Sequence, residues 1–244
     1  MWKHLQQLFV RSLLHIRHPR YHIIQIFLEN PAGGEIAECT HKHPLGFLPA
    51  SLLTVFLYKI VPMTAKQVQE DIDLIVTETL DMLDLIYKGK YESDKQYLRE
   101  LSEKVIRLAH SNISDADAIR YLGEGWVAEE TWAIALYCVI RHIDSVEEAI
   151  IVSVNHNGDS DSTASVCGNI MGAIYGYEHI KNRNIFCPDG KDLEDTLELS
   201  EIVLAIANDL STGCIISEYD PIDTAAKQQW YERYCEMKPT GIGK

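Results

Sequence analysis

The stretch NHNGDSDSTASVCGNIMGAIYG, residues 155–176, places two carboxylates before a run of small residues. The small residues recur at every fourth position and therefore lie on one face of a helix: Ala164, Gly168, Gly172 and Gly176. Because glycine inside a helix costs roughly 1 kcal/mol relative to alanine, this face predicts close packing against another helix. Val166, Ile170 and Ile174 supply apolar contacts on the other faces, so we expect this helix in the middle of a bundle.

Helix signals recur along the rest of the chain. Three capping boxes are present: Thr64-x-x-Gln67, Ser93-x-x-Gln96 and Ser145-x-x-Glu148. Apolar residues at helical spacing predict helices between Thr64 and Gly89 and at 47–61 (with Pro49 in the first turn), 94–110, 115–121, 128–143, 146–154, 161–180, 192–210 and 224–235. Alternating β-branched runs are missing. The predicted fold class is all-α, a single multi-helix bundle.

Composition narrows the class of protein. The chain has 244 residues, of which 46% are hydrophobic, enough for one globular unit. Its net charge of −14 argues against nucleic acid and acidic membranes as partners, and no apolar run reaches the roughly 18 residues of a membrane span. The six cysteines are scattered without a Cys-x-x-Cys pair, which is typical of reduced thiols. We therefore expect a soluble cytoplasmic protein.

Residues 1–30 differ from the remainder in charge. Residues 1–28 contain four basic side chains and no acidic one, and their apolar residues recur at helical spacing. The segment is therefore predicted to be a basic amphipathic helix, either an ordinary surface helix or an organelle-targeting one. A secretory signal would need a continuous apolar stretch. We treat 1–30 as separate from a helical domain at 31–244.

Asp159 and Asp161 allow two interpretations. In one, Asp161 or Ser162 is the N-cap of the helix that follows, and the residues before it form a tight turn. In the other, both carboxylates and a hydroxyl bind a hard cation such as Mg²⁺ or Mn²⁺. The second carboxylate favours a cation, because two carboxylates held together repel unless a cation or a proton lies between them.

Residues 158–176 resemble the Gly-Asp-x-Asp-(Ser/Thr) motif, with its glycine-spaced helix, of the ADP-ribosylglycohydrolase family. Two earlier stretches are similar to the same family in the same order. They are CTHKHPLGFLPASLLTVFLYKI at 39–60 and GEGWVAEETWAIALYCVI at 123–140. The resemblance runs from about residue 31 to residue 235.

The resemblance implies an all-helical hydrolase that removes ADP-ribose from a modified protein side chain or a small acceptor. It implies that Asp159, Asp161 and Ser162 bind Mg²⁺ in a two-metal site, and that His41 and Gly125-Trp126 line the ADP-ribose pocket. The residues alone allow plainer roles: His41 could interact with the first turn of a helix, Trp126 could belong to the core, and Glu130 could be solvated or a cap.

The chain departs from the family pattern in one respect. The family's second metal half, a Thr-Asp-Asp segment with a catalytic glutamate, has no counterpart here. We therefore expect an N-terminally incomplete bundle whose catalytic residue is unknown. The alternative is a catalytically inactive, truncated member that acts as a binding or interaction module, or a gene fragment. Helices without their usual partner would expose apolar surface, which predicts homo-oligomerisation.

Overall fold

The computed structural model describes residues 32–181, 198–212, 225, 228 and 231–232. Within these residues there are ten helices and no strand, which confirms the all-α prediction. The helices are α3 (Ala32–Glu38), α4 (Pro44–Ile60), α5 (Ala65–Ile86), α6 (Glu92–Ala109), α7 (Asp115–Leu122), α8 (Ala128–Arg141), α9 (Val146–Val154), α10 (Ser160–Tyr175), α11 (Tyr177–Ile180) and α13 (Ser200–Thr212).

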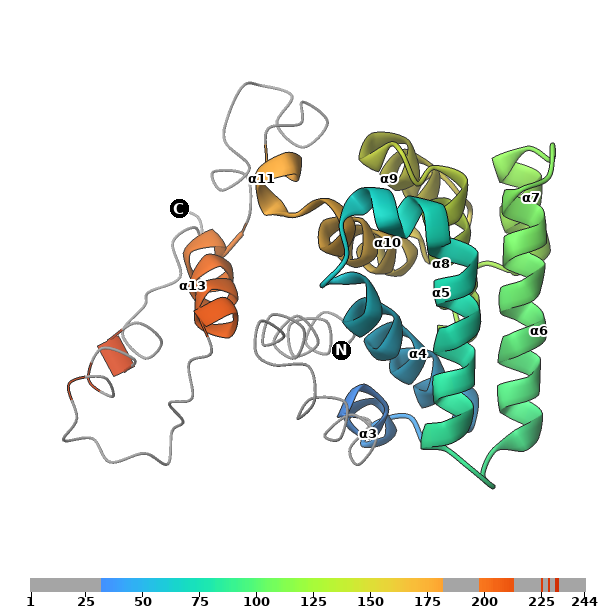
Figure 1. Ribbon diagram of the computed structural model, residues 1–244, viewed down its shortest axis with the longest axis horizontal. Helices are drawn as coiled ribbons and strands as arrows, with labels where there is room; N and C mark the ends of the chain where they lie inside the picture. Colours follow the sequence, from blue (N-terminus) through green and yellow to red (C-terminus); the bar gives the residue numbers. More distant parts are fainter. Residues whose placement is uncertain (1–31, 182–197, 213–224, 226–227, 229–230, 233–244) are drawn as a thin grey trace.

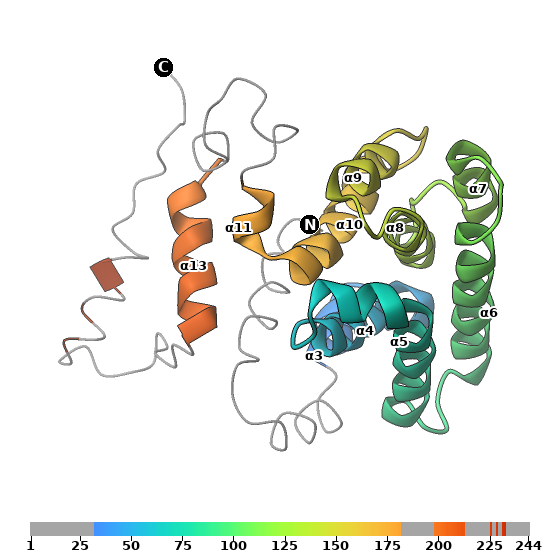
Figure 2. The same ribbon diagram turned by 45° about the horizontal axis from the view of Figure 1, so that its top comes forward.

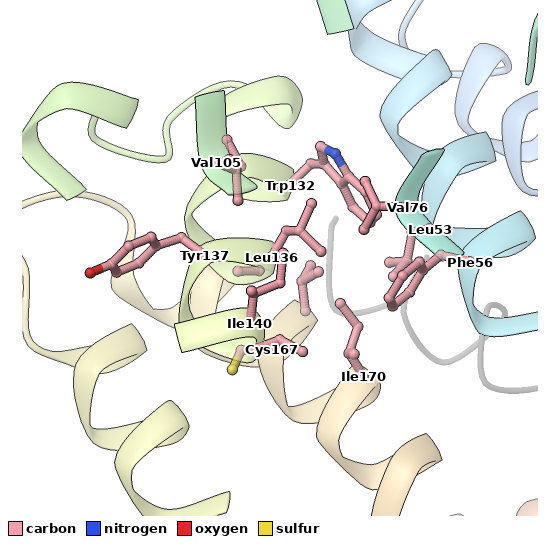
Figure 3. Packing of buried hydrophobic residues seen from close by; sticks show 14 of the residues in the cluster. Leu53, Phe56, Val76, Val105, Trp132, Leu136, Tyr137, Ile140, Cys167 and Ile170 are labelled. Atoms are coloured by element: carbon pink, nitrogen blue, oxygen red, sulfur yellow. The ribbon is translucent and has the colours of Figure 1, made fainter. Parts of the chain in front are cut away.

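Helix α8 is the centre of the bundle. Every residue from Thr131 to Ile140 is buried, as expected for a helix that is surrounded on all sides. Figure 2 shows α8 nearly end-on, with α6 and α7 to one side, α9 and α10 to the other, and α4 and α5 below. In the close view of Figure 3, Trp132 of α8 points toward Phe56 of α4, and their ring centroids are 5.8 Å apart in an edge-on arrangement.

Helix α10 packs along α8 and α9 but is not the central helix, so that part of the prediction is wrong. Val166, Ile170 and Ile174 are buried as expected. The face of small residues remains half-buried at Ala164, Gly168 and Gly172. A Cβ at Gly168 would lie 3.7 Å from Ile150 Cδ1, an ordinary van der Waals contact. Among the described residues, therefore, no close helix approach requires that glycine.

The helix predicted at 161–180 is divided into α10 and α11. Gly176 lies between them with φ +81°, a left-handed conformation that glycine adopts without strain. Its amide donates to the Gly172 carbonyl oxygen and ends α10. Gly176 therefore terminates the helix and does not belong to the packing face.

Of the three predicted helix caps, two are present and one is not. The Thr64–Gln67 capping box is present in full at the start of α5, and Ser145 accepts a hydrogen bond from the Glu148 amide at the start of α9. The Ser93 box is wrong, because α6 begins at Glu92 after Tyr91. Tyr91 has φ 55° and its ring packs edge-on against Phe47 of α4, with centroids 5.4 Å apart.

Helix α4 begins earlier than expected. Its N-cap is His43 and its first residue is Pro44, so Pro49 lies inside the helix and the predicted start at 47 is wrong. Proline is well suited to the first helical position, where its missing N–H has no partner to lose. The apolar run that follows is buried, including Leu48, Leu52 and Phe56.

The remaining predictions concern the ends of the chain. The helices predicted at 1–30 and 224–235 lie outside the continuously described residues. The one predicted at 192–210 overlaps α13, which lies on the same side of the bundle as α11 and apart from the other helices (Figure 1). Cys39, Cys138 and Cys167 are free thiols. In the described part of the chain, no helix combines the length and apolar character that a membrane crossing needs.

Candidate metal and substrate site

The site is built around the start of α10. Asp159 is the N-cap residue, since its carbonyl oxygen accepts the Thr163 amide in the first helical hydrogen bond, at 3.2 Å. Its side chain makes no capping hydrogen bond, while Asp161 Oδ1 accepts the Ser162 amide at 3.1 Å. The expectation that Asp161 or Ser162 is the N-cap is therefore wrong.

The Asp159 carboxyl interacts instead with its neighbours in the same turn. A hydrogen bond with the Asp161 carboxyl, together with burial, raises the pKa of Asp159, whereas a hydrogen bond with the Ser162 hydroxyl lowers it. Two carboxyl groups in this arrangement share a proton or a cation. Asp159, Asp161 and Ser162 thus lie within reach of one another in this turn.

These oxygens fit a hard divalent cation in chemistry, because carboxylates and hydroxyls are the ligands that Mg²⁺ and Mn²⁺ prefer. Across the described residues, no group of three or more His, Cys, Asp or Glu side chains is arranged to hold a metal ion. Of the ligands that such a cation would need, the described residues bring together two carboxylates and a hydroxyl. Water or other ligands would complete the coordination shell.

The turn before α10 is fixed by Thr163, which is fully buried. Its hydroxyl oxygen lies 2.9 Å from the Ser153 carbonyl oxygen and 2.8 Å from His156 Nε2. His156 Nδ1 accepts the Gly158 amide at 3.1 Å, so Nδ1 carries no proton and Nε2–H donates to Thr163. Burial lowers the pKa of His156, which favours this neutral form. Neither residue was singled out from sequence, because a single His or Thr in a turn carries no distinctive pattern.

Gly125 lies directly against Asp159. Its φ is +80°, and a Cβ there would lie 2.9 Å from Thr163 Cγ2 and 3.4 Å from the Asp159 carbonyl oxygen. The Asp159 amide donates to the Glu124 carbonyl oxygen at 2.8 Å. The loop of residues 123–127, hereafter the 123–127 loop, and the turn before α10 therefore form one surface.

Trp126 belongs to that surface and not to the core. It is 66% exposed, and its indole Nε1–H donates to Glu124 Oε2 at 3.0 Å. An indole that is exposed and held by one hydrogen bond offers a flat apolar face for stacking. The core interpretation of Trp126 is wrong, and its place beside Gly125 is compatible with substrate binding.

His41 lies on the wall of a largely apolar pocket between α3, α4, α8 and α10, which Thr131 and Asn169 also line. Thr131 Oγ1 donates to the Gly125 carbonyl oxygen at 2.8 Å, so the pocket adjoins the 123–127 loop through that residue. His43, and not His41, caps α4 by accepting the Leu45 amide at 3.2 Å. His41 also packs against the first turn of α4, since a Cβ on Gly46 would lie 2.9 Å from His41 Cβ, so the plainer interpretation of His41 holds together with its position in the pocket.

Glu130 lies next to the candidate site, and the sequence predicted its position poorly. Its Oε2 accepts the amides of Glu124 at 3.1 Å and Gly125 at 3.0 Å. It is therefore not simply solvated, and it caps the 123–127 loop and not its own helix. No local pattern could have identified it, because the bonds form only when the loop folds back over the first turn of α8.

Comparison with known proteins agrees with this all-helical fold, since the family model described as ADP-ribosylglycohydrolase matches residues 25–213. The chain belongs to the ADP-ribosylglycohydrolase family.

Individual relatives are more distant. The chain is 25% identical over 164 residues to ADP-ribosylhydrolase ARH3 of Homo sapiens, a match that covers 59% of this chain and 44% of that protein. It is 23% identical over 160 residues to ADP-ribosylhydrolase ARH3 of Bos taurus, covering 59% of this chain and 43% of the relative. The chain thus spans less than half the length of these curated relatives.

Proposed function

We propose that this protein is a Mg²⁺-assisted hydrolase that cleaves the glycosidic bond between ADP-ribose and a modified protein side chain or a small acceptor. Family membership supports a hydrolase of ADP-ribose linkages. The observation that carries the proposal is the contact between Asp159 and Gly125, the residue that precedes the exposed Trp126.

Each residue has a task in this proposal. Asp159, Asp161 and Ser162 would hold Mg²⁺, which supplies positive charge that orients the ribose hydroxyls beside the scissile bond. Trp126 provides a flat face against the ligand. Hydrolysis breaks the bond between C1″ and the acceptor nitrogen or oxygen and forms a bond between C1″ and a water oxygen. The water proton passes to the departing acceptor.

A second function is a binding module that recognises ADP-ribose without cleaving it. The observation in its favour is that the described residues bring only two carboxylates to the cation site. A protein with this limited set of ligands could keep the substrate surface of Trp126 and His41 and lack turnover. The two functions therefore differ in product release and not in ligand binding.

The test is a release assay. The purified full-length protein is incubated with arginine- or serine-ADP-ribosylated peptides and Mg²⁺, and free ADP-ribose is measured. Asp159→Ala and Asp161→Ala should lose release, whereas Asp144→Ala, an exposed aspartate in the turn before α9, should retain it. Wild-type protein that binds ADP-ribose but releases none would establish the binding module and remove the hydrolase.

A further inference from the structure

Glu130 lies in the first turn of α8 and its side chain extends over the 123–127 loop. One carboxylate oxygen, Oε2, accepts both the Glu124 amide at 3.1 Å and the Gly125 amide at 3.0 Å. Hydrogen bonds to an ionised carboxylate are shorter and stronger than those between neutral groups. The carboxyl group also fills the space where a Gly123 side chain would stand. The Glu130 side chain therefore holds two amides of the loop, while the Thr131 hydroxyl holds the Gly125 carbonyl oxygen.

On its opposite side, the same loop fixes the position of the Asp159 backbone. The Glu124 carbonyl oxygen accepts the Asp159 amide at 2.8 Å. A Cβ on Gly158 would overlap that same carbonyl oxygen, so the two backbones are in direct contact. A change in the position of Glu124 must therefore move Asp159 or break its hydrogen bond.

Glu124 also orients the aromatic face of the site. Its Oε2 accepts the indole Nε1–H of Trp126 at 3.0 Å. One peptide segment, held by Glu130, thus supplies a carbonyl oxygen to Asp159 and a carboxylate to Trp126. The position of the Asp159 backbone and the orientation of the Trp126 indole therefore both depend on the 123–127 loop.

We propose that Glu130 is a positioning residue that sets the Asp159 carboxylate and the Trp126 ring relative to each other through the 123–127 loop. It touches neither the cation nor the substrate. Its effects on cation affinity and turnover rest on the proposed function, whereas its effect on the Asp159 backbone does not. Supporting residues of this kind typically change metal affinity or activity by about 10- to 100-fold when they are removed.

The first experiment observes the backbone directly. Amide ¹H–¹⁵N spectra of the full chain are compared for wild type, Glu130→Ala, Glu130→Gln and Glu129→Ala. In Glu130→Ala the Gly125 and Glu124 amides should shift upfield, because they lose a charged acceptor, and the Asp159 amide should shift with them. Glu130→Gln keeps an oxygen acceptor and should give smaller shifts at the same three amides. An Asp159 amide at its wild-type position in either Glu130 variant, while Gly125 shifts, would overturn the proposal.

The second experiment measures the consequence at the site by titration of Mn²⁺ into the same proteins. Glu130→Ala should bind Mn²⁺ about tenfold more weakly than wild type, and Glu130→Gln should recover most of the affinity. Glu129→Ala removes the same charge from the same helical turn and should bind as wild type. Equal losses in Glu129→Ala and Glu130→Ala would mean that charge, and not loop position, is responsible, and would overturn the proposal.

The two experiments separate the two hypotheses. If the wild-type protein binds no Mn²⁺, the cation part of the proposed function fails, and the amide shifts still decide the role of Glu130. If Glu130→Ala does not fold, the graded shifts of Glu130→Gln at Gly125 and Asp159 provide the same test. Trp126 supplies an independent signal: its indole N–H resonance should move in Glu130→Ala and stay in Glu129→Ala.

Discussion

The backbone amide of Asp159 donates a 2.8 Å hydrogen bond to the carbonyl oxygen of Glu124. This bond joins the turn before α10 to the 123–127 loop, which are separate in sequence. Through it the turn that holds Asp159 and Asp161 is joined to Glu124, whose carboxylate accepts the indole N–H of Trp126. The candidate site is therefore a junction between two loops, and its stability depends on how closely their backbones can approach.

Gly158→Ala should break this junction. The new Cβ would overlap the Glu124 carbonyl oxygen, which is part of a backbone fixed by Glu130 and cannot yield easily. Overpacking of this kind typically costs about 1–3 kcal/mol. We expect the free energy of unfolding, measured by urea denaturation, to fall by that amount and Mn²⁺ binding to weaken. A variant as stable as wild type would show that the backbones are further apart than the structure places them.

Asp161→Asn should abolish stabilisation by divalent cations. Anything that binds the folded state alone stabilises it, by about 2.7 kcal/mol at a concentration one hundred times the dissociation constant. We expect Mn²⁺ to raise the melting temperature of wild type and of Asp144→Asn but not of Asp161→Asn. Calorimetric titration measures the same binding directly. Unchanged Mn²⁺ binding in Asp161→Asn would mean that this turn is not the cation site.

Thr163→Val tests the support beneath the turn. Valine keeps the shape of threonine but leaves the Ser153 carbonyl oxygen and His156 Nε2–H without the hydroxyl that they contact. A buried polar group left unsatisfied costs about 1–3 kcal/mol. Urea denaturation should show that loss for Thr163→Val and a smaller one for Thr163→Ser, which keeps the hydroxyl. Equal effects of the two substitutions would assign the loss to packing.

Much of the fold could be predicted because it depends on local pattern. Helix α9 covers the residues that apolar spacing and Ser145 predict, and α5 begins at its capping box. The start of α6 could not be predicted, because Tyr91 is held in place by its ring contact with Phe47 of α4. The start of α6 therefore depends on a contact with another helix, and a local capping pattern does not reveal such a contact.

The candidate site, like the fold, could be predicted from local pattern only in part. The motif pointed to Asp159, Asp161 and Ser162 and the resemblance to Gly125 and Trp126, and the structure shows contact between Gly125 and Asp159. Glu130 and Thr163 were missed because their hydrogen bonds reach backbone atoms of other segments. The unbroken apolar sequence of α8 indicates its central position. The glycine spacing of α10 led instead to the incorrect prediction that α10 is the central helix. Small residues leave room for another helix to pack closely. In the described part of the chain, however, the small-residue face of α10 is only half-buried.

Gly172→Ala tests this corrected interpretation of the α10 face. A Cβ there would lie 3.9 Å from Ile180 Cδ1, which is ordinary contact. Alanine in a helix interior is favoured over glycine by roughly 1 kcal/mol. We therefore expect Gly172→Ala to raise the free energy of unfolding by up to about that amount. Destabilisation would mean that another segment packs closely on this face, as the sequence first suggested.

The stability of the turn before α10 should depend on pH through His156. Burial lowers its pKa below the ordinary value of about 6.5, so the folded state favours the neutral imidazole whose Nδ1 accepts the Gly158 amide. The unfolded chain takes up a proton more readily. The contribution of His156 is therefore complete above about pH 6.5 and is lost as the pH falls from there toward the folded pKa. Urea denaturation between pH 8 and pH 5 should show a steeper loss for wild type than for His156→Gln, which has no such proton. Parallel profiles would show that the imidazole is not held neutral by the fold.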